Sequence, residues 1–252
     1  MHVARNLLFT TGILVAFSHG ASAATFTLSP VQDAFVSSAN PTANYGAAGA
    51  LLVNAAGLPK GEFDSLLQFN FAAAKSSFDL TFGVGQWSIQ SVTLQLTSAN
   101  PGNPIFNSPA AAGSFTLNWM QDDSWTEGNG TPTAGSTTGG ITYATLPGFR
   151  SGSDQLLGTY SFPGGTSGNN TYTLGLNSSF VTDATAGNAV SLLALPADSA
   201  IVYSANSQNF TTSASRPVLT VTAFGVPEPG TAGLLFAGVG AGLLPRRRRR
   251  ET

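Results

Sequence analysis

The sequence contains no cysteine, and its two histidines, His2 and His19, both lie close to the N-terminus. The absence of cysteine excludes disulfide bonds and thiolate chemistry. Removal of an N-terminal signal, argued below, would leave a chain with no histidine at all. That excludes Ser-His-Asp and Cys-His catalysis, the usual zinc sites and the commonest general base.

Charged residues are also scarce, at 9% of the chain against about 25% in an ordinary domain. Between residues 24 and 225 the acids are Asp33, Glu62, Asp64, Asp79, Asp122, Asp123, Glu127, Asp154, Asp183 and Asp198, and the bases are Lys60, Lys75, Arg150 and Arg216. This segment is therefore acidic and lacks the basic footprint of a nucleic-acid-binding protein. We expect no nucleic-acid partner.

Residues 1–23 have the three parts of a secretory signal peptide. Arg5 gives the positive start, Leu7 to Phe17 is an apolar run, and Ala21-Ser22-Ala23 is a small-residue cleavage site. The apolar run is too short for a transmembrane helix, which needs about 20 residues. We expect a signal helix that passes the Sec translocon and is cut by signal peptidase.

Residues 226–252 combine a proline motif, an apolar run and an arginine cluster. The motif consists of Val226, Pro227, Glu228, Pro229 and Gly230, and the cluster of Arg246, Arg247, Arg248, Arg249 and Arg250. Two prolines keep the motif extended, and the arginines stop transfer at the cytoplasmic side. The run between them, Thr231 to Leu244, would span ~21 Å as a helix, short of the ~30 Å hydrocarbon core. A short, weak transmembrane helix is predicted.

This order of parts resembles the PEP-CTERM sorting signal, with its Pro227-Glu228-Pro229 motif intact. The resemblance implies cleavage by a membrane-embedded exosortase after transient anchoring in the inner membrane. It also implies release to the cell surface or extracellular matrix of a Gram-negative bacterium. A plain C-terminal anchor is the alternative.

The segment from 24 to 225 has the pattern of an all-β domain. Short stretches alternate apolar and polar residues between Gly, Pro, Asn and Ser clusters, most clearly at 65–71, 91–97, 115–119, 172–176 and 219–222. No convincing amphipathic helix is present, since the stretch 184–188 is too short. About ten such strands predict an antiparallel β-sandwich or jelly roll. The stretch from Gly128 to Gly140 is predicted to be a long loop.

Several segments occur in the order of one known module. They are 33–36 (DAFV), 40–41 (NP), 44–46 (NYG), 51–53 (LLV), 66–69 (LLQF), 92–96 (VTLQL), 125–128 (WTEG) and 216–221 (RPVLTV). Together they resemble the DNRLRE, or disaggregatase-related, family over most of residues 25–223. The resemblance implies a β-sandwich and includes a class of carbohydrate-binding module.

Asp33 lies close in sequence to a turn-rich loop that contains Asn40, Asn44 and Tyr45. A carboxylate with loop carbonyls is a ligand set for a structural Ca²⁺ ion. The alternative, which we favour, is an Asx turn in which the Asp33 side chain bonds the local backbone. No other cofactor is indicated.

Asp122, Asp123 and Glu127 form the densest acidic group, beside Trp119 and Trp125. Paired carboxylates and aromatic rings are the components of a glycosidase or sugar-binding site, and the carboxylates could instead bind Ca²⁺. The family resemblance favours a structural role for Trp125 instead. Further candidates for stacking on a sugar are the aromatics Trp87, Tyr143, Phe149, Tyr160 and Tyr203.

The sequence therefore predicts an exported, non-enzymatic β-sandwich protein that binds polysaccharide at the cell surface or in an exopolysaccharide matrix. Two alternatives stay open. One is a polysaccharide hydrolase that uses Asp122, Asp123 or Glu127, and the other is a structural matrix or adhesion protein without a small ligand.

Overall fold

The computed structural model describes residues 22–58, 61–99 and 109–226. Residues 1–21 of the predicted signal peptide and the segment from Pro227 onward lie outside these residues. Val226 is described, and its N–H donates to the carbonyl of Gln86 at 2.8 Å. Within the described ranges, no helix has both the length and the apolar character that crossing a bilayer requires.

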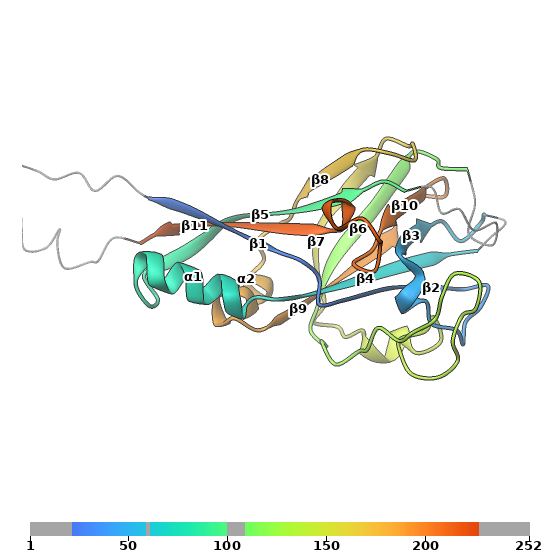
Figure 1. Cartoon of the computed structure of the whole chain (residues 1–252), viewed down its shortest axis with the longest axis horizontal. Coiled ribbons are helices and arrows are strands. Elements are labelled where there is room, and N and C mark those ends of the chain that lie inside the picture. The colour runs from blue at the N-terminus through green and yellow to red at the C-terminus, as the bar shows by residue number, and fades with distance from the viewer. Residues whose placement is uncertain (1–21, 59–60, 100–108, 227–252) are drawn as a thin grey trace, which may run out of the picture.

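Two antiparallel sheets form the domain (Figure 1). The smaller sheet has the order β1 (Ala23–Leu28), β11 (Val218–Gly225), β5 (Trp87–Thr97) and β8 (Asn169–Thr173). The larger has the order β10 (Val202–Asn206), β3 (Ala50–Asn54), β4 (Phe63–Asn70), β9 (Ala189–Pro196), β6 (Gly113–Met120) and β7 (Gln155–Phe162), with β2 (Gln32–Ser37) also paired to β4. The prediction of antiparallel sheets in a sandwich is confirmed.

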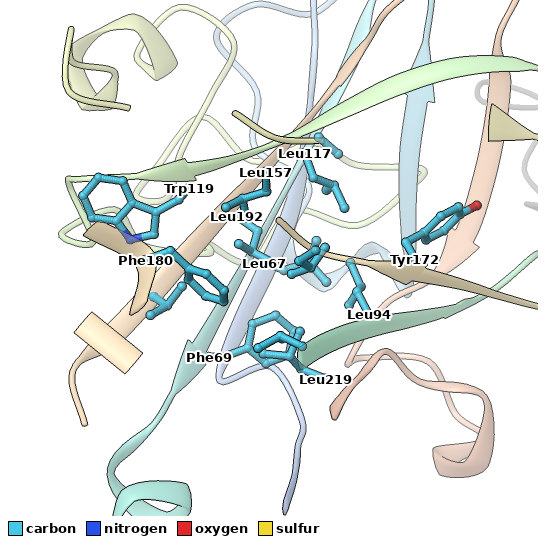
Figure 2. Packing of buried hydrophobic residues seen from close by; sticks show 14 of the residues in the cluster. Leu67, Phe69, Leu94, Leu117, Trp119, Leu157, Tyr172, Phe180, Leu192 and Leu219 are labelled. Carbon is cyan, nitrogen blue, oxygen red and sulfur yellow. The ribbon is translucent and has the colours of Figure 1, made fainter. Parts of the chain in front are cut away.

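The main core lies between the two sheets. Leu94 of β5 and Leu219 of β11 come from the smaller sheet, whereas Leu67, Leu117 and Leu192 come from the larger one (Figure 2). Each of these side chains is at most 1% exposed. Because alternate residues of a strand face opposite sides, the predicted apolar alternation supplies this core directly.

A β-bulge lets one long strand keep its apolar residues on the core side. Ser91 of β5 pairs with Thr222, but Ile89 pairs with Ala223, so that Gln90 is the extra residue. A one-residue shift reverses the faces of a strand. The bulge therefore buries Trp87 and Ile89 as well as Val92, Leu94 and Leu96, on either side of the shift.

The larger sheet is covered on its outer face by a long loop. Ala34, Leu66 and Leu193 point outward from β2, β4 and β9, and pack under Trp125 and Ile141 of residues 121–151. This covering loop contains no strand, only isolated bridges and a 3₁₀ turn at Leu146–Phe149. Its stretch from Gly128 to Gly140 is the loop that the sequence predicts. Residues of β4 are buried on both faces as a result.

The expectation that the domain has no helix is wrong. Helix α1 (Ala72–Phe82) and helix α2 (Ser178–Ala186) lie at the end of the molecule where β1 begins and β11 ends (Figure 1). Each buries one aromatic residue and one alanine four residues apart, Phe78 with Ala74 and Phe180 with Ala184. Two apolar residues per helix give too weak a helical periodicity to be recognised in the sequence. Both helices are stabilised by packing on the sheets rather than by helix propensity.

Candidate functional site

Asp33 and Glu127, which are far apart in sequence, meet beside the loop that follows β10. The backbone N–H of Gln208 donates to Asp33 Oδ2 at 2.6 Å, and the Gln208 side-chain amide donates to Glu127 Oε2, also at 2.6 Å. Burial, and to a lesser degree the charge of Glu127, raises the pKa of Asp33. We call this cluster the acidic centre; it joins β2, the covering loop and the loop after β10.

The Asn-Tyr-Gly segment adds a third loop to the acidic centre. The Asn209 side-chain amide donates to the Gly46 carbonyl at 2.9 Å and also to Glu127 Oε1. A Cβ atom at position 46 would overlap Glu127 Cγ and the Glu127 carbonyl, so that only glycine fits here. The two segments 44–46 and 125–128, which the sequence treats separately, therefore pack against each other.

Burial controls the protonation of this pair. Asp33 is fully buried, and burial is the main cause that raises its pKa to about 8, against an opposing hydrogen bond from Gln208. Burial also raises the pKa of Glu127, while the side chains of Asn209 and Gln208 lower it. Asp33 Oδ1 has no hydrogen-bond partner. The expected Asx turn at Asp33 is wrong, because its hydrogen bond goes to Gln208 rather than to the local backbone.

Asn44 and Tyr45, the other candidates near Asp33, make contacts within the protein that stabilise the loops. Asn44 Oδ1 accepts from the Gly130 N–H at 2.8 Å, and its amide donates to the carbonyls of Ser136 (2.8 Å) and Gly139 (2.5 Å). Asn44 thus holds the stretch 128–140 in place. Tyr45 is buried and stacks on Phe35, with ring centroids 4.7 Å apart.

Asp122, Asp123 and Glu127 do not share one set of contacts. Asp122 accepts hydrogen bonds from the Ser124 N–H and hydroxyl, which lower its pKa. Asp123 faces another part of the surface, where burial raises its pKa to about 6. Trp125 is 1% exposed and donates from Nε1 to the Ser191 hydroxyl at 2.8 Å. Trp125 therefore lies in the packing under the covering loop.

Asp123 lines a small polar depression beside α2, with a volume of about 410 Å³. Its other lining residues are Trp119, Gln121, Ser178, Ser179, Thr182, Asp183 and Asn188. Trp119 is 5% exposed, so the aromatic surface here is small.

A second groove, of about 530 Å³, lies between the covering loop and one end of the larger sheet. The loop supplies Tyr143, Leu146, Pro147, Arg150 and Ser151, while β4 and the residue before it supply Asp64 and Glu62, and β9 supplies Leu195 and Pro196. We call it the Tyr143 groove. It combines a half-exposed aromatic ring and apolar side chains with charged groups of both signs.

Asp64 forms the polar base of the Tyr143 groove. Its pKa is raised to about 7, mainly by burial and also by the charge of Glu62, while the charge of Arg150 opposes the rise. Asp64 is 3% exposed, and its Oδ1 has no hydrogen-bond partner. The base of the groove therefore contains a polar atom whose hydrogen-bonding capacity is unsatisfied within the protein.

The structure separates the remaining aromatic candidates. Trp87 and Tyr203 are in the main core, at 8% and 2% exposure. Tyr160 is partly buried, and its hydroxyl lies within hydrogen-bonding distance of the carbonyls of Leu157 and Thr173, either of which can accept its proton. Tyr143 and Phe149 pack against the covering-loop cluster while partly exposed, and Tyr143 alone of the five lines one of the two hollows described above.

Sequence reasoning missed Gln208, Asn209 and Gly46 at the acidic centre, and Glu62, Asp64 and Arg150 at the groove. The NYG motif includes Gly46, so its glycine gave a usable signal for close backbone approach. No local pattern marks the others. Across the described ranges, no group of three or more His, Cys, Asp or Glu residues is arranged to hold a metal ion.

Comparisons with known proteins give one informative match. No curated protein matches the chain significantly. A solved structure titled Desmodium yellow mottle tymovirus aligns with 87% of this chain and 97% of its own, at 11% identity and a TM-score of 0.23, which is too low to support any argument. Residues 24–146 match the model of carbohydrate-binding module family 96. The matched segment includes Asp33, Gly46 and Glu127 of the acidic centre and Asp64 and Tyr143 of the groove.

Proposed function

We propose that this chain is a non-catalytic carbohydrate-binding protein and that polysaccharide binds in the Tyr143 groove. The match of residues 24–146 to carbohydrate-binding module family 96 carries the proposal. Modules of this kind typically bind sugars without cleaving them.

The composition of the groove favours it over the α2 depression as the binding site. Sugars present apolar C–H faces and polar hydroxyl edges, so a site that binds them needs an aromatic surface together with hydrogen-bonding groups. Tyr143 provides the ring, and Asp64 and Arg150 provide polar groups beside it. The α2 depression is lined by short polar side chains around a buried tryptophan.

The hydrolase alternative was based on Asp122, Asp123 and Glu127, and no two of these carboxyl groups face one common site. Asp122 is bonded within its own turn, Asp123 faces α2, and Glu127 is held by Gln208 and Asn209. Glycosidases need two carboxyl groups across one sugar site. We therefore favour binding without catalysis.

We further propose that the protein is exported and processed by an exosortase, then stays at the cell surface or in the surrounding matrix. The support is the sequence of residues 1–23 and 226–252, with its signal-peptide pattern and its proline motif, apolar run and arginine cluster. Mass spectrometry of the protein from strains with and without the exosortase tests this. Loss of the C-terminal segment in the first strain alone is expected, and an intact C-terminus in both contradicts it.

A glycan array probed with the purified full-length chain tests binding, followed by calorimetry on the best glycan. Tyr143→Ala should weaken binding by about 5- to 150-fold if loss of the ring costs on the order of 1–3 kcal/mol, the range found when an aromatic that stacks on a nucleic-acid base is replaced by alanine. Tyr143→Phe keeps the ring and should bind nearly as wild type. Thr182→Trp fills the α2 depression and should not affect binding.

The outcomes separate the sites. Loss of binding with Thr182→Trp and retention with Tyr143→Ala would move the ligand to the α2 depression. Absence of binding to any glycan would favour the structural matrix protein.

A further inference from the structure

The acidic centre contains two carboxyl groups that lack a cationic partner. Asp33 is fully buried and Glu127 is half-buried, and the charge of Glu127 adds to burial in raising the pKa of Asp33. Among the described residues the one ion pair is Lys75–Asp79, which lies in α1. Arg216 acts on Asp33 only through its charge, because its Nε donates to the Phe210 carbonyl at 2.8 Å. Burying two carboxylates without a cation is strongly unfavourable.

One oxygen of this pair also lacks a hydrogen bond. Asp33 Oδ2 accepts from the Gln208 N–H, whereas Asp33 Oδ1 has no partner although the residue is 0% exposed. The Ser207 hydroxyl lies close enough to lower the pKa of Asp33. A buried, unsatisfied carboxylate oxygen beside a second carboxyl group needs either a proton or a metal ion.

The acidic centre contains further oxygen atoms. The Gly46 carbonyl and Glu127 Oε1 both lie at the Asn209 side-chain amide. A half-turn of that amide exchanges its NH₂ group for its oxygen, and the two orientations are nearly isosteric. Two carboxylates, a peptide carbonyl and an amide oxygen are hard ligands from flexible loops. That set suits Ca²⁺ better than Mg²⁺, which demands near-ideal octahedral geometry.

We propose that the acidic centre is a Ca²⁺ site formed by Asp33, Glu127, the Gly46 carbonyl and Asn209. The ion ties the start of β2, the 44–46 loop, the covering loop and the loop after β10 to one another. A chain without cysteine has no disulfide for this purpose. Asp33 and Glu127 were both candidates from sequence, whereas Asn44 and Tyr45 are not part of this ligand set and Gly46 and Asn209 are new to it.

Calcium titration of the EDTA-treated full-length chain tests this proposal. Calorimetry should show saturable binding at a dissociation constant on the order of 10⁻⁴ M or tighter, and the thermal midpoint should rise with calcium concentration. Magnesium at equal concentration should give a smaller rise. Circular dichroism of each calcium-free variant confirms that it is folded before titration.

Two substitutions locate the ion. Glu127→Gln keeps the size of the side chain and should weaken calcium binding by about tenfold or more. Asp122→Asn removes an acid from the same loop but outside the centre, and should bind calcium as wild type. An equal calcium response in wild type and Glu127→Gln, or no calcium binding by the wild-type chain, would overturn the proposal.

Discussion

Trp125 was a candidate both for stacking on a sugar and for a structural role, and its replacement by phenylalanine tests which of the two it has. The indole is 1% exposed, packs in the cluster with Ala34 and Leu66, and donates to the Ser191 hydroxyl at 2.8 Å. Its role in this structure is to hold the covering loop on the outer face of the larger sheet.

The expected loss of stability has two parts. Removal of the hydrogen bond to Ser191 costs about 1 kcal/mol. The smaller ring leaves a void of roughly 40 Å³, which at about 24 cal/mol per Å³ costs about 1 kcal/mol more. Trp125→Phe should therefore reduce the free energy of unfolding by about 2 kcal/mol, which lowers the melting temperature by about 4–8 °C for a domain of this size.

Urea unfolding followed by circular dichroism measures this change, since the far-ultraviolet signal does not depend on the tryptophan itself. Leu80→Ala is a suitable control, because Leu80 is 90% exposed and its loss should change stability by less than about 0.5 kcal/mol. Glycan affinity of Trp125→Phe should match that of wild type. Unchanged stability together with lost glycan binding would refute the structural role of Trp125.

Three further predictions concern other buried polar groups. Because the pKa of Asp64 is raised from 3.8 to about 7, Asp64 should contribute a loss of stability as pH rises from 4 to 7, while Asp33, whose pKa is about 8, contributes a separate loss that continues to higher pH. Asp64→Asn should remove the first of these losses, on the order of 4 kcal/mol, and a decline equal to that of wild type in urea titrations would contradict it. Asn44→Ala should reduce the free energy of unfolding by about 3 kcal/mol, because three hydrogen bonds to Gly130, Ser136 and Gly139 are lost. Limited proteolysis should then cut within residues 128–140, and an uncut loop would count against this role. Asn177→Ala should reduce the free energy of unfolding by about 1 kcal/mol, because the Phe180 N–H loses its helix-capping acceptor, and Asn177→Asp should keep the stability of the wild type. Equal melting temperatures for the wild type and both variants would argue against the cap.

The strands were predictable because their apolar residues alternate on a period of two. Val92, Leu94 and Leu96 show this clearly, and all three are buried in the core. The helices were not, since Phe180 with Ala184 is a stripe of only two residues. Asn177 and Gly187, which cap α2 at its two ends, were the available signal.

The sites were harder to predict because they depend on contacts between distant segments. Asp33 and Glu127 were both identified from sequence, but as members of different clusters. Their union requires the loop after β10, which supplies Gln208 and Asn209 and carries no motif of its own. The sequence around Asp64 indicates only a strand. Asp64 lies at the base of a groove because the covering loop packs beside that strand.

The most direct test of carbohydrate binding in the Tyr143 groove is chemical-shift mapping by NMR of the isotope-labelled full-length chain during titration with the best glycan from the array. Saturable shifts should centre on the backbone amides of the non-proline residues that line the groove, which are Glu62, Asp64, Tyr143, Leu146, Arg150, Ser151 and Leu195. Shifts centred on residues 178–183 and 188, beside α2, or the absence of any saturable shift, would contradict the account.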